Sequence, residues 1–243
     1  MTQKIFFNQK CHKDWELNLV NHTIVIIGAS SEISGHFIKQ LLTTHKKIVL
    51  ISRKYQPIFN DINQIIIDDY LKNLNQIVNE INKVGDCFII FFNGALYENR
   101  PLKYPTKLEI KNTKRINFTI PFLMTKRFQI ECQDVKKFIY ISSLAAVVPR
   151  TKNYVYGLNK QKLENSVYKL GLNSLLIFRF GKVFTRMSKN HKTPPFSITA
   201  EEAANSIIKN MDKTGIIYPK FGLKVISFLL QITPKFLINI FKY

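Results

Sequence analysis

Short apolar runs alternate with longer amphipathic stretches along this chain. The first apolar run is TIVIIGAS, and the set covers residues 23–30, 47–52, 64–68, 87–93, 138–143 and 174–181. Runs of this length without polar alternation are typical of strands that are covered on both faces, as in a parallel sheet. The stretches SEISGHFIKQLLTTH and YLKNLNQIVNEINKVG between them have apolar residues at helical spacing.

This alternation predicts the fold class and the domain organisation. Strand–helix repetition predicts an α/β fold, with a single Rossmann-fold domain whose doubly wound parallel sheet carries helices on both faces. We expect this domain to span residues 23–221, after an N-terminal extension at 1–22 and before an amphipathic C-terminal tail at 222–243. Residues 186–198, with two adjacent prolines, are expected to form a loop or lid.

Charge and composition narrow the choice of partners. The chain has 243 residues and a formal net charge of +20. Lysines spread over a solvated surface are one explanation, and attraction to an anionic membrane surface or a phosphorylated substrate is the other. Long basic blocks interleaved with aromatic residues are absent from the sequence, so a nucleic-acid groove is not expected.

Cysteine usage and the apolar runs bear on the compartment. Cys11, Cys87 and Cys132 are far apart and lack metal-ligand spacing, so neither a metal site nor a disulfide framework is expected. This usage fits a reducing cytoplasm. The N-terminus lacks the pattern of a secretory signal peptide, and no apolar run reaches the roughly 18 residues of a membrane span. We therefore expect a cytoplasmic protein.

The first apolar run leads into the turn Gly28-Ala-Ser-Ser-Glu-Ile-Ser-Gly35. A glycine at this place lets the chain turn sharply into a helix, whose first N–H groups can face a diphosphate. A strict G-x-G-x-x-G pattern is absent, so this segment alone is weak evidence, and an ordinary strand–turn–helix unit is the alternative.

Four further segments with candidate functional residues follow this turn along the chain. Asn117 lies in RINFTIPFLMT, Ser143 ends an apolar run, YGLNK brings Tyr156 and Lys160, and RFGKVFT comes at residues 179–185. A tyrosine with a lysine four positions later is about what chance supplies in a chain so rich in lysine. The order of the segments, and the 13 positions from Ser143 to Tyr156, carry more weight.

Together these segments resemble the short-chain dehydrogenases/reductases over roughly residues 23–205. The turn is similar to their TGxxxGxG motif, with Gly28 at the first glycine, Glu32 at the second and Ser34 at the third. Glu32 would need a backbone conformation that a side chain tolerates. RFGKVFT is similar to the RPGxVxT segment of this family, with Phe180 in place of the proline.

The resemblance implies four catalytic residues, namely Asn117, Ser143, Tyr156 and Lys160. Tyr156 would be the proton donor, Ser143 would hydrogen-bond the substrate carbonyl as charge develops on its oxygen, and Asn117 would anchor a water. Lys160 would bind the nicotinamide ribose. Because Tyr156 and Lys160 are one helical turn apart, we also expect the lysine ammonium to lower the tyrosine pKa from its ordinary value of about 10. Ser142 remains the near competitor of Ser143.

The end of the second apolar run is expected to select the cofactor. Ser52 stands where NAD-binding relatives carry an acidic residue for the ribose hydroxyls, and Arg53 suits a 2′-phosphate. NADP(H) is therefore favoured over NAD(H), with a basic surface turn as the alternative. The resemblance implies that Asp68 contacts the adenine and that Thr185 contacts the nicotinamide carboxamide. The further cofactor contacts that it implies are Gly28, Ser30, Ser31, Ile33, Asn93, Gly94, Tyr156, Lys160 and Val183.

The C-terminal stretch FGLKVISFLLQITPKFLINIFKY is apolar with interspersed lysines, and Pro234 interrupts it. A basic amphipathic end of this kind can lie on an anionic membrane surface, here the inner face, or it can pack over the lid or at a dimer interface. Together with GASSEISG and TAEEAANSIIKNM, it more loosely resembles the reductase partner of decaprenylphosphoryl ribose 2-epimerase. That family reduces a keto-sugar carried on a polyprenyl phosphate.

These patterns predict an NADP(H)-dependent oxidoreductase that interconverts a ketone and a secondary alcohol. Its substrate would be a small-molecule or lipid-linked carbonyl compound, such as a keto-sugar of cell-surface polysaccharide synthesis. A reductase of long-chain keto lipids, an epimerase with tightly held NAD and a non-catalytic nucleotide-binding scaffold remain alternatives. The resemblance also implies a homodimer or homotetramer.

Overall fold

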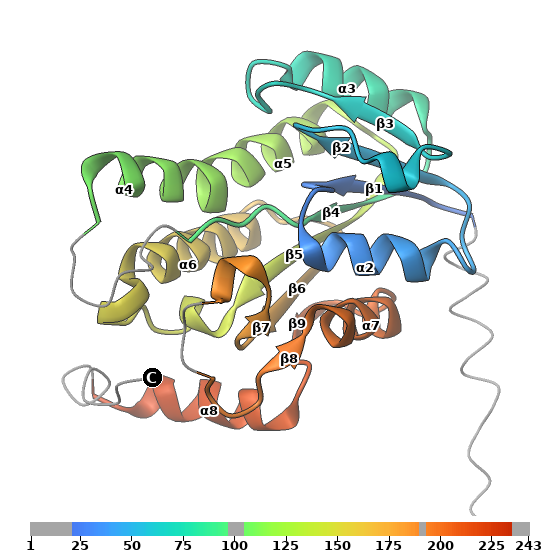
Figure 1. The fold of residues 1–243 in the computed structure, drawn as a ribbon. Helices are drawn as coiled ribbons and strands as arrows, with labels where there is room; N and C mark the ends of the chain where they lie inside the picture. The colour runs from blue at the N-terminus through green and yellow to red at the C-terminus, as the bar shows by residue number, and fades with distance from the viewer. Residues whose placement is uncertain (1–20, 97–104, 190–192, 235–243) are drawn as a thin grey trace, which may run out of the picture.

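A sheet of seven parallel strands forms the centre of the molecule (Figure 1). The computed structural model describes residues 21–96, 105–189 and 193–234. The strands lie in the order β3-β2-β1-β4-β5-β6-β9, and a separate parallel pair joins β7 to β8. Their bounds are β1 Thr23–Ile27, β2 Ile48–Ser52, β3 Asn63–Ile66, β4 Cys87–Phe91, β5 Val135–Ser143, β6 Leu175–Phe180, β7 Val183–Phe184, β8 Ile198–Thr199 and β9 Gly215–Ile217.

Helices cover both faces of this sheet. One apolar core joins α2 and α7 to one face, and a second core joins α3, α5 and α6 to the other. A five-residue π-helical segment, Arg115–Thr119, connects α4 to α5. The helices are α2 Glu32–Leu41, α3 Leu74–Lys83, α4 Lys107–Lys114, α5 Ile120–Glu131, α6 Tyr154–Lys169, α7 Ala200–Asn210 and α8 Phe221–Ile232.

Burial explains why the apolar runs become strands. Every residue of β1, β2 and β4 is buried, so these strands need apolar side chains on both faces of the sheet. Parallel strands require a long crossover connection between them, and the amphipathic helices supply it. The predicted single Rossmann domain with a doubly wound sheet is therefore confirmed.

Some element bounds differ from the sequence pattern. β1 ends at Ile27 because Gly28 takes a φ of 84° and turns the chain. The edge strand β9 and the pair β7–β8 were not expected, since two or three residues are too few to give a periodic signal. Part of the expected lid is thus ordered by β8, where Ile198 pairs with Val183.

The described part of the predicted tail is largely one helix, α8, which ends before Pro234. Leu223 of α8 is buried and packs on Gly181, and the ring of Phe196 lies against Gly222. The opposite side of α8 exposes five large apolar side chains, at Phe221, Val225, Phe228, Leu229 and Ile232. Within the described ranges, no helix has the length and apolar character to cross a membrane. Cys11, residues 1–20 of the predicted extension and the tail beyond residue 234 lie outside the described residues.

The strand order places a topological switch point between β1 and β4. The chain proceeds from β1 to β2 on one side and returns to β4 on the other. In open α/β sheets, ligands bind beyond the carboxyl ends of the strands at such a point. Gly28 follows β1 there and Asn93 lies shortly after β4, so the fold brings two of the predicted cofactor residues together.

Candidate active site

Three of the four predicted catalytic residues meet at the carboxyl end of β5. Ser143 is the last residue of β5, and Tyr156 and Lys160 lie on the first turns of α6. The side chains of Ser143 and Tyr156 are hydrogen-bonded, and the Lys160 Nζ lies 6.0 Å from the centre of the Tyr156 ring. This edge of the sheet therefore presents two hydroxyls and one ammonium within a short distance.

The two adjacent serines of β5 face different partners. The Ser142 hydroxyl is buried and donates to the Glu164 carboxylate. The Ser143 hydroxyl accepts a hydrogen bond of 3.2 Å from the Ala145 N–H and lies beside Tyr156. Both partners belong to α6, so Ser142 is committed to Glu164 and Ser143 is the serine bonded to Tyr156.

Lys160 is a buried cation held by backbone oxygens. Its Nζ donates to the Ile141 carbonyl at 2.9 Å and to the Asn93 carbonyl at 3.1 Å. Burial lowers the pKa of Lys160 to about 8, and the nearby Glu164 carboxylate opposes that shift. Lys160 thus links β4 and β5 to α6, and it titrates within a pH unit or so of neutrality.

The pKa of Tyr156 differs from the expectation. We expected the Lys160 ammonium to lower it, but burial raises the pKa of Tyr156 to about 12. The hydrogen bond with Ser143 acts in the opposite direction, while the charge of Glu164 adds to the increase. The expectation of a lowered pKa is therefore wrong for this state, because loss of phenolate hydration outweighs a lysine that points at carbonyl groups. Tyr156 keeps its proton at neutral pH.

Asn117 lies in the π-helical segment between α4 and α5. Its fully buried amide donates to the Ala95 carbonyl at 2.7 Å and to the Thr113 carbonyl at 2.9 Å, and its Oδ1 accepts from the Ala95 N–H at 3.3 Å. Asn117 thereby fixes the chain that follows β4. Short π-helical segments often occur at functional sites. The anchoring of a water by Asn117 stays a prediction.

The turn after β1 keeps its form despite two missing glycines. A Cβ on Gly28 would lie 3.2 Å from the Asn93 nitrogen, so this position needs glycine. Ser34 is fully buried, and its hydroxyl donates to the Ala29 and Ser31 carbonyls at 2.8 and 2.7 Å. Glu32 is the first residue of α2 and takes no left-handed backbone conformation. Serine and glutamate are therefore compatible with the turn.

The remaining predicted cofactor residues lie along the same edge of the sheet. Ser52 is buried and its hydroxyl donates to the Lys54 carbonyl at 2.6 Å, which leaves Arg53 exposed on the turn after β2. The Asp68 carboxylate accepts from the Asp69 N–H at 2.8 Å, and hydrogen bonding lowers the pKa of Asp68. The others are near the turn after β1 or around β7, namely Ser30, Ser31, Ile33, Val183 and Thr185.

Asn93 supplies an observation that bears on a bound nucleotide. Its Oδ1 is buried, yet it has no hydrogen-bond partner among the described residues. The same atom lies 3.5 Å from the position that a Cβ would take on Gly28. A buried acceptor without a partner is costly unless a ligand or a water satisfies it. The switch point therefore fits a ligand that carries hydroxyl or amide donors, such as a nucleotide.

Two residues that support the site, Gly157 and Glu164, are not evident from the sequence. A Cβ on Gly157 would lie 2.6 Å from the Ala145 carbonyl oxygen, so glycine lets α6 approach the loop after Ser143. The buried Glu164 pairs with Arg179 of β6, and Arg179 in turn donates to the Tyr218 hydroxyl at 2.8 Å. The only sequence signals were a glycine directly after Tyr156 and a glutamate one helical turn after Lys160.

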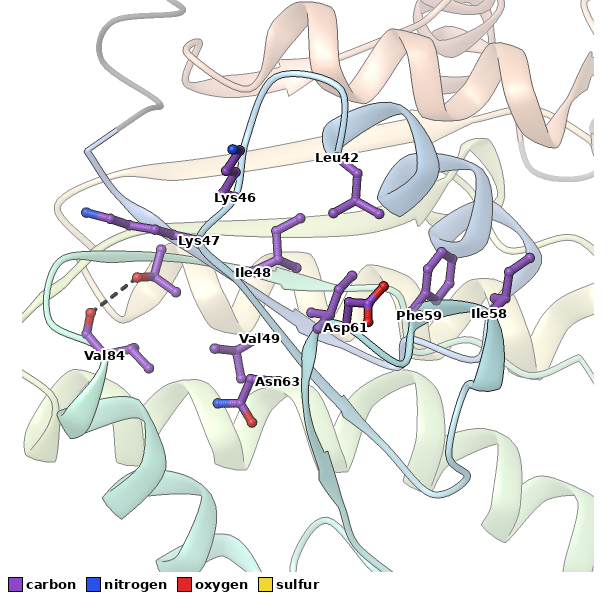
Figure 2. Close-up of a pocket in the computed structure, with 12 residues that line it drawn as sticks. Leu42, Lys46, Lys47, Ile48, Val49, Ile58, Phe59, Asp61, Asn63 and Val84 are labelled. Atoms are coloured by element: carbon purple, nitrogen blue, oxygen red, sulfur yellow. Dashed lines mark hydrogen bonds between the residues drawn. The ribbon is translucent and has the colours of Figure 1, made fainter.

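A cavity of about 570 Å³ lies at the opposite edge of the sheet (Figure 2). It is formed around the amino ends of β1, β2 and β3, and Lys46, Lys47 and Phe59 are among its lining residues. Two further lining residues are hydrogen-bonded, since the Thr23 hydroxyl donates to the Val84 carbonyl at 3.2 Å. None of the predicted site residues lines this cavity.

Solved structures with the same architecture were found by comparison. A short-chain dehydrogenase from Burkholderia cenocepacia J2315, in complex with NADP, has a TM-score of 0.72 and 15% identity and covers 88% of this chain and 99% of its own. This chain has the short-chain dehydrogenase fold. The aldohexose dehydrogenase of Thermoplasma acidophilum, in ligand-free form, has a TM-score of 0.67 and 16% identity, with coverage of 85% and 95%. ElxO with NADP bound has a TM-score of 0.68 and 14% identity, with coverage of 84% and 99%. Neither the protein-family models nor the curated proteins gave a match.

Proposed function

We propose that this protein is an NADP(H)-dependent oxidoreductase that interconverts a ketone and a secondary alcohol, with Tyr156 as the proton donor in the reducing direction. One observation carries the proposal. The hydrogen-bonded pair of Ser143 and Tyr156 lies beside the buried Lys160, whose ammonium is bonded to the Asn93 carbonyl at the switch point. A proton donor and a nucleotide site therefore share one edge of the sheet.

Each of the proposed catalytic residues has a different role in the reduction of a carbonyl group. The bound nucleotide would supply the hydride. The Ser143 hydroxyl is suited to donate a hydrogen bond to the substrate oxygen as negative charge develops there. Tyr156, which its raised pKa keeps protonated, then transfers its proton to that oxygen. Asn117 would contribute by fixing Ala95 after β4.

The chain offers a consistent set of groups for holding NADP(H). The turn after β1 presents the N-terminus of α2, which favours an anion. Beside it lie the orphaned Asn93 Oδ1 and the segment after β7. The proposed contacts are Gly28, Ser30, Ser31, Ile33, Ser52, Arg53, Asp68, Asn93, Gly94, Tyr156, Lys160, Val183 and Thr185.

The preference for NADP(H) over NAD(H) rests on the turn after β2. Ser52 has no carboxylate to accept hydrogen bonds from the ribose hydroxyls, and its own hydroxyl donates to the Lys54 carbonyl. Arg53 is exposed and free of competing acidic neighbours in the adjoining sequence, so it can reach a 2′-phosphate. Two of the solved structures with this fold contain NADP, which agrees with this preference.

A fluorescence titration of the protein with NADPH and with NADH tests this proposal. We expect NADPH to bind more tightly, and Arg53→Ala to weaken NADPH alone by about 10-fold to 100-fold, the range for a lost charged hydrogen bond. Lys46→Ala removes an equal charge at the cavity of Figure 2 and should leave both affinities unchanged. Failure of both nucleotides to bind would contradict the proposal and favour a non-catalytic scaffold without a nucleotide.

A lipid-linked carbonyl substrate is the finer part of the proposal. On the outward side of α8, Phe221, Phe228 and Ile232 are 79%, 63% and 61% exposed. Exposed aromatic and aliphatic side chains on a helix of a chain with a net charge of +20 suit an anionic membrane surface. Contact there would bring a keto-sugar on a polyprenyl phosphate, or a long-chain keto lipid, near the site.

Vesicle sedimentation tests this contact. Binding to vesicles with anionic lipid, loss of binding in Phe228→Ser and little binding to neutral vesicles would support it. Equal sedimentation of the wild type and Phe228→Ser would contradict it, and self-association through α8 would then be the better reading of the exposed face. A homodimer or homotetramer, a cytoplasmic location and an epimerase activity with tightly held NAD stay predictions.

A further inference from the structure

An ion pair crosses the start of α2 at the place proposed for the cofactor. Glu32 is the first residue of α2, and Arg186 directly follows Thr185. The two Glu32 carboxylate oxygens accept hydrogen bonds from the Arg186 backbone N–H at 3.0 and 3.1 Å. The Arg186 Nε also donates to Glu32 Oε1. Both the backbone and the side chain of Arg186 are therefore bound to one carboxylate.

The position of this pair conflicts with a bound dinucleotide. In a doubly wound fold the diphosphate lies at the N-terminus of the helix that follows β1, which here is α2. Glu32 puts a negative charge on the first turn of that helix, whereas a glycine there would leave the backbone N–H groups accessible to the diphosphate. The diphosphate and the Glu32 carboxylate would therefore compete for the N-terminus of α2 and for Arg186.

The exposure of the two side chains indicates which one is free to move. Glu32 is 30% exposed and Arg186 is 86% exposed. An ion pair with one partner so exposed contributes little to stability, because water screens it. Arg186 can therefore leave Glu32 without disturbing the core, and its guanidinium is well matched to phosphate oxygens.

We propose that Glu32 and Arg186 form a latch over the diphosphate site, and that Arg186 exchanges the Glu32 carboxylate for the cofactor diphosphate on binding. The inference rests on the proposed function, since it requires a dinucleotide at this site. It assigns Arg186 as a cofactor-binding residue and Glu32 as a residue that weakens cofactor binding. The exchange also releases the segment after Thr185 from the start of α2.

Nucleotide titration of a four-member set tests the latch, with wild type, Glu32→Gln, Arg186→Gln and the double variant measured against NADPH. Glu32→Gln should tighten binding about fivefold, the factor for removing one like charge near 4 Å in water. Arg186→Gln should weaken binding about 10-fold or more. The double variant decides the role of Arg186, because Arg186→Gln should still weaken binding when Glu32 is already neutral. Glu131→Gln, which removes a carboxylate from the surface pair with Arg127, is the matched control and should change nothing.

A second readout needs no nucleotide. In the free protein, Glu32→Gln should speed hydrogen exchange at the Arg186 amide, because that amide loses a charged acceptor.

NADPH binding to the wild type without any gain in Glu32→Gln would overturn the latch and leave the proposed function standing. If Arg186→Gln has no effect in the Glu32→Gln background, Arg186 only neutralises Glu32, and the assignment fails. If no member of the set binds NADPH or NADH, the latch and the proposed function fail together.

Discussion

The two edges of the central sheet differ in what they offer a ligand. The amino edge has the cavity of about 570 Å³, lined by apolar side chains and by exposed charges such as Lys46 (Figure 2). The carboxyl edge has Tyr156 and Lys160, two buried groups whose pKa values burial shifts in opposite directions, upward for Tyr156 and downward for Lys160. Perturbed, buried titratable groups that converge are better indicators of chemistry than empty volume. This difference favours the carboxyl edge as the proposed active site.

The largest expected effect separates chemistry from binding at that edge. Tyr156→Phe removes the proton donor, so turnover with a carbonyl substrate and NADPH should decrease by about 10²-fold to 10⁴-fold. The NADPH affinity should stay within a few-fold, because the ring remains in place. Tyr154→Phe is the matched control, since Tyr154 is 51% exposed two residues earlier on α6. Full turnover in Tyr156→Phe would assign the chemistry elsewhere.

The adjacent serines of β5 give the next largest effect. Ser143→Ala should lower kcat by about 100-fold, the loss typical of one donor to a developing oxyanion. Ser142→Ala should mainly lower the free energy of unfolding, by about 1–3 kcal/mol, because it deprives the buried Glu164 carboxylate of a donor. Steady-state kinetics and urea unfolding of both variants check this. Equal kinetic losses in the two would contradict the separate roles.

A pair of glycines tests how α6 is positioned at the carboxyl edge. Gly157→Ala should destabilise the protein by about 1–3 kcal/mol, because the new Cβ would lie 2.6 Å from the Ala145 carbonyl oxygen. Gly35→Ala meets no atom within 4 Å. It should therefore stabilise α2 by up to about 1 kcal/mol. Denaturant unfolding distinguishes them, and a Gly157→Ala protein as stable as the wild type would show that the close approach is relaxed in solution.

Lys160 is expected to make the stability of the protein depend on pH. Its pKa is lowered from 10.5 to about 8 in the folded protein. Between these values the unfolded chain binds more protons than the folded one, so the free energy of unfolding rises with pH, by about 1.4 kcal/mol per unit from a single group. The raised pKa values of the Cys87 and Cys132 thiols oppose this increase above about pH 9, and the raised pKa of Tyr156 opposes it above about pH 10. The window for the measurement is therefore pH 8 to 10.

Two lysine variants isolate this contribution. Unfolding of Lys160→Met between pH 8 and 10 should lack the part of the increase that Lys160 supplies. Lys162→Met, which alters an exposed lysine on the same helix, should keep the wild-type pH dependence. Identical profiles for Lys160→Met and the wild type would show that Lys160 is charged normally in the folded state.

The sequence predicted the fold well because the strands are buried on both faces. Continuous apolar runs such as Ile24–Ile27 leave few alternatives to a central parallel strand, and the helices between them fix the order of the chain. The spacing of Ser143, Tyr156 and Lys160 was also visible, because one strand end and one helical turn bring them together.

The rest depends on contacts between distant segments. The pKa of Tyr156 is set by burial, which no local pattern reveals. Glu32 and Arg186 lie 154 positions apart, so their pairing appears only once β7 is placed beside the start of α2. The Glu164–Arg179 pair likewise joins α6 to β6. A short edge strand such as β9 has too few residues to register as a pattern.

Hydrogen exchange with and without NADPH tests the central claim most directly, because one experiment covers both edges of the sheet. We expect slower exchange at the start of α2, in the chain directly after β4 and around Thr185. Exchange should be unchanged at the amino edge, in Pro57–Phe59 and around Lys46. Protection confined to the amino edge would place the nucleotide in the cavity of Figure 2 and contradict the assignment of Tyr156.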